Sequence, residues 1–251
     1  MNKIFVSRDK IISDTDKVII SGNRISFLES GSYSLEYDNI NKINLIIDVS
    51  NGHKIMLYES SFLDDIEVNN KYIINRGSLI VNKFYNNNSV LENIDIDLCS
   101  LGDKIEYRFS NICKHNENYV ININHKARAT SSNICNKSIA MDGSILNFVI
   151  NSKVEKEYEK SVLNQNTRIV TLGDSKSNIS PNMFIDCDDI EAKHGSVIGT
   201  FKDDLVFYLM SRGIEYNDAI KLLIKGYLLS NVDTDSNLRE KIFNVIDMYW
   251  R

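Results

Sequence analysis

Two side chains in the last third of the chain could bind a transition metal. Cys187 and His194 lie close together in the sequence, and a thiolate beside a neutral imidazole suits iron. A buried structural thiol and a turn histidine that hydrogen-bonds to the backbone are the competing interpretations. Without further context, the residue types alone favour these structural interpretations.

Three carboxylates surround the same cysteine: Asp186, Asp188 and Asp189. Such a cluster could bind calcium, or could share acid and base roles in a β-helical polysaccharide lyase or hydrolase. Enzymes of that kind are usually secreted, and the N-terminus has no continuous apolar segment ending in small residues. We therefore expect no signal peptide, a cytoplasmic protein and a solvated acidic turn.

Motifs of several enzyme classes are missing from the sequence. It contains no Walker A segment, no Gly-x-Ser-x-Gly and no His-Glu-x-x-His. The four cysteines, at positions 99, 113, 135 and 187, are too far apart for a Cys-x-x-Cys metal knuckle, and an intracellular setting disfavours disulfides. We expect buried, reduced thiols and no catalytic activity, with any ATP hydrolysis carried out by a partner.

The composition is that of an ordinary globular protein. The 251 residues are 43% hydrophobic and 25% charged, which excludes a disordered chain. The net charge of −5 argues against nucleic acid as a partner, because duplex binding needs a basic surface. The longest apolar stretches are far too short to span a bilayer.

Short β-rich runs separated by polar turns fill the chain from Lys17 to about Gly199, for example at 17–20, 43–47 and 119–123. This spacing predicts an all-β region, which could be a sandwich, a barrel or a β-helix. Asparagines alternate with apolar residues in several runs and are expected to point outward or to stack in a ladder.

The pattern becomes helical after this region. A first helix is expected from an N-cap at Thr200, with Asp203 in the capping-box position, to a C′ glycine at Gly213. Apolar spacing predicts a second helix from about Tyr216 and a third that opens at 235–236.

Three contiguous segments carry a family resemblance. The run 188–199, with its His-Gly-Ser-Val-Ile-Gly, the run 205–214, with Phe-Tyr-Leu-Met-Ser-Arg-Gly, and the run 219–227, ending in Gly-Tyr, resemble motifs of the SufB/SufD family of iron–sulfur cluster assembly proteins. Upstream, His125 followed by Thr-Ser-Ser and Lys137 resembles a strand pair of the same family. The likeness is weak before residue 123.

This resemblance implies a fold and a role. The fold would be a right-handed parallel β-helix over residues 1–199 with a small helical, ATPase-docking domain over 200–251. Family members pair through their β-helices, as a SufB–SufD heterodimer or as a homodimer, and each binds one SufC-type ABC ATPase. The family's N-terminal helical domain is expected to be missing, because the β pattern begins almost at once. Such a protein is a scaffold and not an enzyme.

The resemblance also assigns candidate site residues. His194, with Cys187, would bind iron or a nascent iron–sulfur cluster, transiently and in complex with a partner. A two-fold contact is expected around 167–170 and 181–195. The segment that docks the ATPase corresponds here to six residues: Leu205, Tyr208, Leu209, Arg212, Gly213 and Tyr227.

Departures from the family pattern leave the subtype open. Positions that carry a cysteine and a glutamate in SufB correspond by spacing to Asn166 and Gly195, and a cysteine of some SufD proteins corresponds to Ala192. The sequence therefore does not choose between SufB and SufD, or between a SufB-like partner and a second copy of this chain. A β-helical carbohydrate-active enzyme and a degenerate regulatory member that binds no iron remain alternatives.

Overall fold

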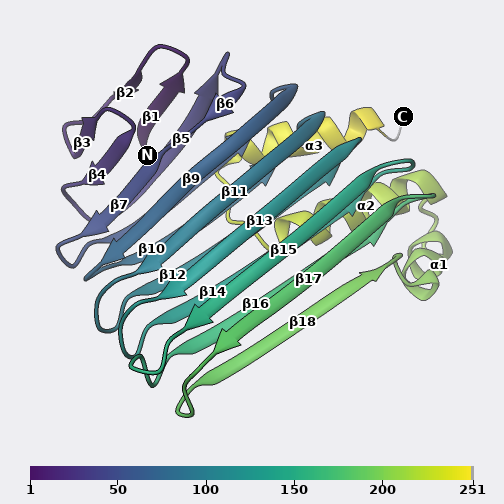
Figure 1. The fold of residues 1–251 in the computed structure, drawn as a ribbon. Coiled ribbons are helices and arrows are strands. Elements are labelled where there is room, and N and C mark those ends of the chain that lie inside the picture. The colour runs from purple at the N-terminus through teal and green to yellow at the C-terminus, as the bar shows by residue number, and fades with distance from the viewer. Residues whose placement is uncertain (250–251) are drawn as a thin grey trace.

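The computed structural model describes residues 1–249 and has a solenoid of parallel strands at its core (Figure 1). Sheet A contains, in spatial order, β18 (Glu191–Gly199), β16 (Val162–Thr171), β14 (Ser131–Ala140), β12 (Lys104–Cys113), β10 (Ser78–Tyr85), β8 (Lys54–Ser61), β5 (Gly31–Asp38), β1 (Asn2–Ser7) and β2 (Ile11–Ser13). Sheet B contains β17 (Lys176–Ile185), β15 (Ile145–Val154), β13 (Asn116–His125), β11 (Ser89–Leu98), β9 (Asp65–Asn75), β7 (Ile46–Ser50), β4 (Arg24–Phe27) and β3 (Val18–Ser21), with β6 (Lys42–Ile43) paired to β9. From β7 onward the long strands alternate between the two sheets, so the predicted parallel β-helix is confirmed.

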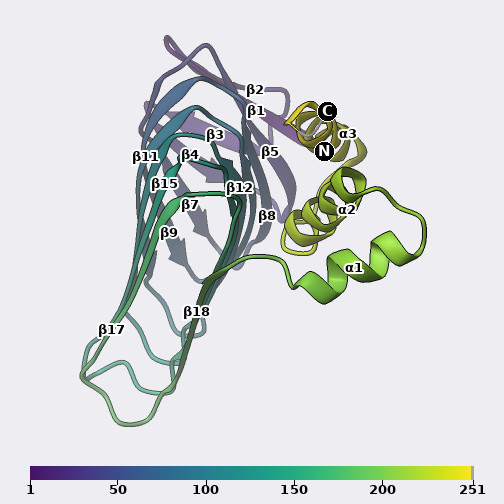
Figure 2. The same ribbon diagram turned by 90° about the vertical axis from the view of Figure 1, so that its right-hand side faces the viewer.

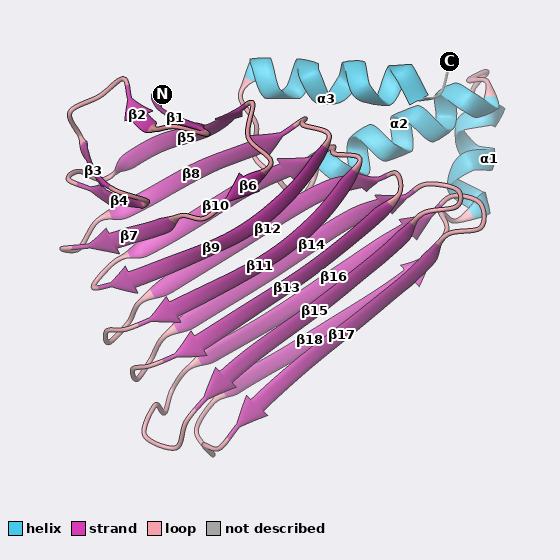
Figure 3. Ribbon diagram, turned by 45° about the horizontal axis from the view of Figure 1, so that its top comes forward, coloured by secondary structure: helices cyan, strands magenta, loops and turns pink. Residues whose placement is uncertain are grey.

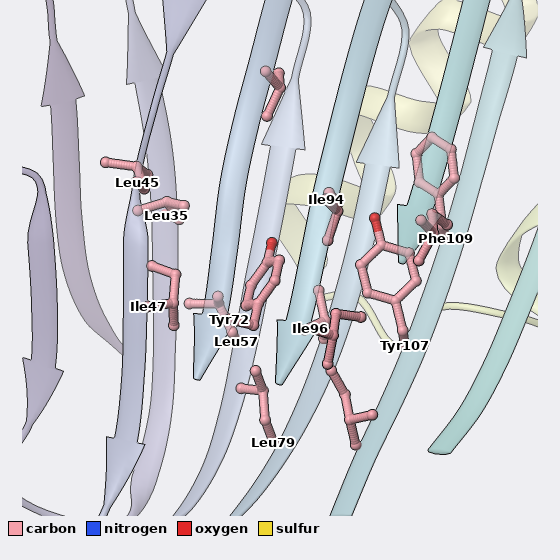
Figure 4. Packing of buried hydrophobic residues seen from close by; sticks show 14 of the residues in the cluster. Leu35, Leu45, Ile47, Leu57, Tyr72, Leu79, Ile94, Ile96, Tyr107 and Phe109 are labelled. Carbon is pink, nitrogen blue, oxygen red and sulfur yellow. The ribbon is translucent and has the colours of Figure 1, made fainter. Parts of the chain in front are cut away.

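Side-chain alternation along each strand builds the core between the sheets. In β9, for example, every second side chain is buried, from Ile66 to Ile74. The strands stack in register, so inward residues of successive turns lie above one another, as Tyr72 of β9 and Ile96 of β11 do (Figure 4). Burial of these apolar columns is the main stabilising contribution to the fold.

An asparagine ladder runs along the outer face of sheet B, as the alternating pattern predicted. The side-chain amide of Asn182 donates to Asn151 at 2.9 Å, Asn151 donates to Asn122 at 2.8 Å, and Asn122 donates to Asp95 at 2.9 Å. All of the amides point the same way along the solenoid. The ladder therefore ties the strands of sheet B together outside the core.

The N-terminal end differs from the expectation in two respects. Strands begin at Asn2 and not near Lys17, because β1 already pairs with β5 along its whole length. The pairs β1–β2 and β3–β4 are antiparallel hairpins rather than parallel turns. The outermost strands at this end, β2 and β3, have only three and four residues.

Three helices follow the last strand: α1 (Asp203–Ser211), α2 (Tyr216–Leu229) and α3 (Ser236–Tyr249). Helices α2 and α3 lie along the outer face of sheet A, whereas α1 projects beside it (Figures 2 and 3). Buried residues of α2 and α3 form a second apolar cluster with sheet A through Phe84, Ile112, Ile139 and Val170. The division into two domains at Gly199 stays a prediction, and the two parts share this cluster.

The helix ends are partly as expected. The capping box predicted at Thr200 is wrong, because α1 begins at Asp203 after the extended residue Lys202. The two aspartates in the first turn of α1 interact favourably with the helix dipole. Gly213 is confirmed as the C′ residue, with φ of 84°. Asp235 caps α3 by accepting the Leu238 N–H at 2.7 Å. No helix within residues 1–249 is long and apolar enough to cross a membrane.

Candidate functional site

His194 lies in the middle of β18, the last strand of the solenoid. It pairs in register with Gln165 of β16, so both side chains are on the lumenal face of sheet A. Gln165 is buried, and its amide nitrogen crosses the lumen to donate to Ser152 Oγ at 2.7 Å. Within residues 1–249 no later strand covers His194, which is exposed. Its imidazole is therefore accessible at the open end of the lumen.

Cys187 lies in the turn between β17 and β18 and is half-buried. His194 lies three residues into β18, so the first residues of the strand lie between it and the turn that carries the thiol. Within residues 1–249, no group of three or more histidine, cysteine, aspartate or glutamate side chains is placed to hold a metal ion. The chain thus brings the two predicted ligands to the same end of the solenoid without completing a ligand set.

The cysteines are free, but the expectation that all of them are buried is wrong. Only Cys113 is buried, whereas Cys99, Cys135 and Cys187 are half-buried. Loss of solvation raises the pKa of the thiols of Cys99, Cys113 and Cys135. These three thiols therefore stay protonated at neutral pH.

The aspartates next to Cys187 are exposed. Asp186, Asp188 and Asp189 occupy the turn that joins β17 to β18. This position agrees with the interpretation of a solvated turn.

The motif around His125 has a structural role. The buried imidazole of His125 lies with Nδ1 2.7 Å from Thr130 Oγ1 and with Nε2 2.9 Å from Ser132 Oγ. Burial lowers the pKa of His125 to about 4, so the ring is neutral at physiological pH. Both ring nitrogens are satisfied by hydroxyl groups, and the side chain fixes the connection between β13 and β14.

Helix α1 presents two apolar faces, although none of its residues is buried. Val206, Phe207 and Met210 line a cavity of about 590 Å³ between α1, α2 and the turn after β16. The predicted docking residues Leu205 and Tyr208 do not line this cavity and are 47% and 56% exposed. These two predicted docking residues thus lie on the side of α1 that faces away from the cavity.

Three further docking candidates have different environments. The guanidinium of Arg212 lies 5.3 Å from the ring of Tyr208 and is exposed with it. Leu209 is half-buried beside them. Tyr227 instead packs on sheet A, where its hydroxyl donates to the Arg168 carbonyl at 2.6 Å. The Tyr227 side chain therefore attaches α2 to the solenoid.

A buried charged cluster inside the solenoid was missed from the sequence. The ammonium of Lys83 lies 3.1 Å from Glu59 and also bonds to Glu92, and all three side chains are inaccessible to solvent. The hydroxyls of Tyr72 and Tyr85 donate to Glu59. Burial raises the pKa of Glu92, while the charge of Lys83 opposes this change. The three charged residues occupy inward positions in the alternating pattern of β8, β10 and β11. Charged residues at such positions were the signal that the sequence offered for this cluster.

Comparison with known proteins places this arrangement in a family. The model of "SUF system FeS cluster assembly, SufBD core domain" matches residues 81–227, which is more than half of the chain. Residues of the strand pair at His125, of β18 and of α1 all fall inside this match.

Individual relatives are similar over shorter stretches. The iron–sulfur cluster assembly protein SufD of Bacillus subtilis is 30% identical over 113 residues, which are 45% of this chain and 26% of that protein. SufD of Escherichia coli is 33% identical over 64 residues, which are 25% of this chain and 15% of that protein. The matched stretch is thus about a quarter or less of these relatives' length. On the family match, together with the solenoid and its helical end, the chain belongs to the SufB/SufD family.

Proposed function

We propose that this chain is a non-catalytic scaffold subunit of a SUF-type iron–sulfur cluster assembly complex in the cytoplasm. It pairs through its β-helix with a second family member and binds a SufC-like ABC ATPase through its C-terminal helices. The observation that carries the proposal is the match of the family core to residues 81–227, which include the open end of the solenoid and helix α1.

The ATPase contact is assigned to the outward face of α1. Leu205 and Tyr208 are large, exposed side chains, and the charged group of Arg212 lies beside the Tyr208 ring. Aromatic residues and arginine are the side chains most often found at the energetic centre of protein interfaces. Gly213 ends α1 with a positive φ and so fixes where this face is presented.

The test of this contact is a charge reversal. We expect Arg212→Glu to weaken binding of a SufC-type ATPase by more than about tenfold, measured by isothermal titration calorimetry. Arg239→Glu introduces the same change on α3 and serves as the matched control. Unchanged binding by Arg212→Glu and by Tyr208→Ala would place the docking site elsewhere. Point variants are preferable to deletion of 200–251, which would uncover the outer face of sheet A.

The nascent cluster is the cargo of this scaffold, and His194 is the residue proposed to bind its iron. The imidazole is exposed at the open end of the lumen, and Cys187 supplies a thiol at the same end. Neighbouring Asn166 and Gly195 add no thiolate or carboxylate. A second subunit, either a SufB-like protein or another copy, completes the ligand set.

Anaerobic reconstitution tests this assignment. The isolated chain is incubated with ferrous iron and sulfide and followed by visible absorption, alone and with a SufB-like subunit. We expect weak absorption from the chain alone, a gain with the second subunit, and loss of that gain in His194→Ala but not in His115→Ala, which alters an exposed turn histidine. A stable cluster on the isolated chain that survives His194→Ala would contradict the assignment. If no cluster forms on the chain alone or with the SufB-like subunit, the chain is a regulatory member that binds no iron.

A further inference from the structure

Gln165 lies next to His194 in one column of lumenal side chains. The column passes from Ile134 of β14 through Gln165 of β16 to His194 of β18, the last strand of sheet A (Figure 3). Gln165 is 3% exposed, whereas His194 is exposed. Neighbouring strands of a sheet are about 4.8 Å apart, so side chains at these two positions can contact each other.

The side-chain amide of Gln165 has a defined orientation. Its Nε2 donates to the Ser152 hydroxyl of β15 at 2.7 Å and to the Asn182 carbonyl of β17 at 3.2 Å. These two bonds use both amide hydrogens. A backbone carbonyl can only accept, so a rotated amide would place two oxygen atoms against each other. The nitrogen is therefore held by sheet B, and Oε1 remains as an acceptor.

This acceptor lacks a donor. Gln165 Oε1 is buried, and within residues 1–249 it has no hydrogen-bond partner. A buried carbonyl oxygen without a partner is unfavourable, because it has lost its hydrogen bonds to water. On one side of the column Ile134 has no polar side-chain atom, and on the other His194 carries a ring N–H in either neutral tautomer. The donor that the column offers is thus the imidazole.

We propose that Gln165 is a positioning residue for His194, whose ring donates one N–H to Gln165 Oε1. The other ring nitrogen then carries no proton and keeps its lone pair for iron. Histidines that bind metals usually donate their second ring N–H to such an acceptor, which fixes the tautomer and the orientation of the ring. This inference rests on the proposed role of His194 and adds a residue that does not itself touch the iron.

A purely structural role for Gln165 would use the other end of its amide. Through Nε2 the side chain connects sheet A to sheet B, so its loss should destabilise the last turns whatever Oε1 does. Ser152→Ala removes one partner of the nitrogen and leaves the oxygen in place. Gln165→Met removes both polar atoms at a similar volume. Gln165→Glu loses the same N–H bonds as Gln165→Met but keeps an acceptor oxygen, and is its matched control.

The position of the proton on the His194 ring distinguishes the two roles. The chain is labelled with isotopic nitrogen in histidine, and the ring nitrogens are recorded by NMR at about pH 8, where an ordinary imidazole is neutral. His194→Ala identifies the signals of His194 among those of the four histidines. We expect one tautomer in the wild type and in Ser152→Ala, and a mixture of both in Gln165→Met. Gln165→Glu should keep the proton on the same ring nitrogen as the wild type.

Iron binding provides a second measurement. Ferrous iron is titrated anaerobically against a coloured chelator into the complex of each variant with a SufB-like subunit. We expect Gln165→Met to bind iron at least about tenfold more weakly than the wild type, as loss of a hydrogen-bond partner of a metal ligand usually causes. Ser152→Ala should bind iron like the wild type. Far-ultraviolet circular dichroism of each variant checks that the solenoid is folded.

The outcomes separate this inference from the proposed function. Identical His194 signals in the wild type and in Gln165→Met would overturn the inference, even if iron binding falls, because altered packing would then be the cause. If Gln165→Met does not fold, movement of the ring proton to the other nitrogen in Gln165→Glu would overturn it. A tautomer that depends on Gln165, with iron binding unchanged in both Gln165→Met and His194→Ala, would support the hydrogen bond and overturn the role of His194 in binding iron.

Discussion

Replacing Glu117 with glutamine should remove most of the pH dependence of stability that arises from ionisation of this side chain. Glu117 is fully buried in the lumen, where the Tyr119 hydroxyl donates to its Oε2 at 2.7 Å and the Asn111 amide donates to the same oxygen. Burial raises the pKa of this carboxyl from 4.5 to about 8, although both hydrogen bonds act in the opposite direction. The folded protein therefore holds a proton at neutral pH that the unfolded chain releases.

The sign and the size of this pH dependence follow from the linkage between proton binding and folding. Because the folded-state pKa lies above the unfolded-state value, the stabilisation is fully present below about pH 4.5 and is lost as the pH rises through 8. Between pH 5 and pH 9 this carboxyl alone lowers the free energy of unfolding by about 4 kcal/mol. Glutamine resembles the protonated acid and has no proton to lose, so the variant should lack this decrease.

Urea unfolding followed by circular dichroism at pH 5, 7 and 9 measures the effect. We expect the free energy of unfolding of Glu117→Gln, relative to wild type, to rise by about 4 kcal/mol from pH 5 to pH 9. Glu157→Gln removes a carboxylate from an exposed turn and controls for net charge. If the wild-type and Glu117→Gln curves stay parallel within about 1 kcal/mol, Glu117 is ionised in the folded protein and the reasoning fails.

Two further substitutions test the packing of the solenoid and its helices. Lys83→Met should lower the free energy of unfolding by about 3–5 kcal/mol, since it leaves Glu59 and Glu92 buried without their cation. Combining it with Glu59→Gln and Glu92→Gln should recover most of this loss, measured by thermal unfolding. If the triple variant shows no recovery, the buried charges are not the cause of the loss. Tyr227→Phe removes the hydrogen bond to the Arg168 carbonyl and should cost about 1 kcal/mol in urea unfolding. The same variant should bind the ATPase like wild type, and a large loss of binding would make Tyr227 part of the docking surface.

Local patterns in the sequence predicted much of the fold. Alternating apolar residues identified the strands, and the asparagines between them form the ladder that ends at Asn182. Gly213 marked the end of α1 because a positive φ there favours glycine. The likeness of 188–199 and 205–214 to family motifs selected the parallel β-helix among the all-β folds.

The helix faces required the structure. The family resemblance selected Leu205 and Tyr208 on α1, but only the packing of the helix decides that Val206 and Met210 face the cavity instead.

The sequence by itself determined which segments become strands and helices, because those preferences depend on neighbours within a few residues. Only the tertiary structure decided what lies next to what. Lys83 meets Glu59 from the previous turn of sheet A and Glu92 from sheet B, and His194 stacks on Gln165. These contacts depend on the register between turns, which is set by turn lengths and by burial of whole columns of side chains. A local sequence pattern does not determine this register.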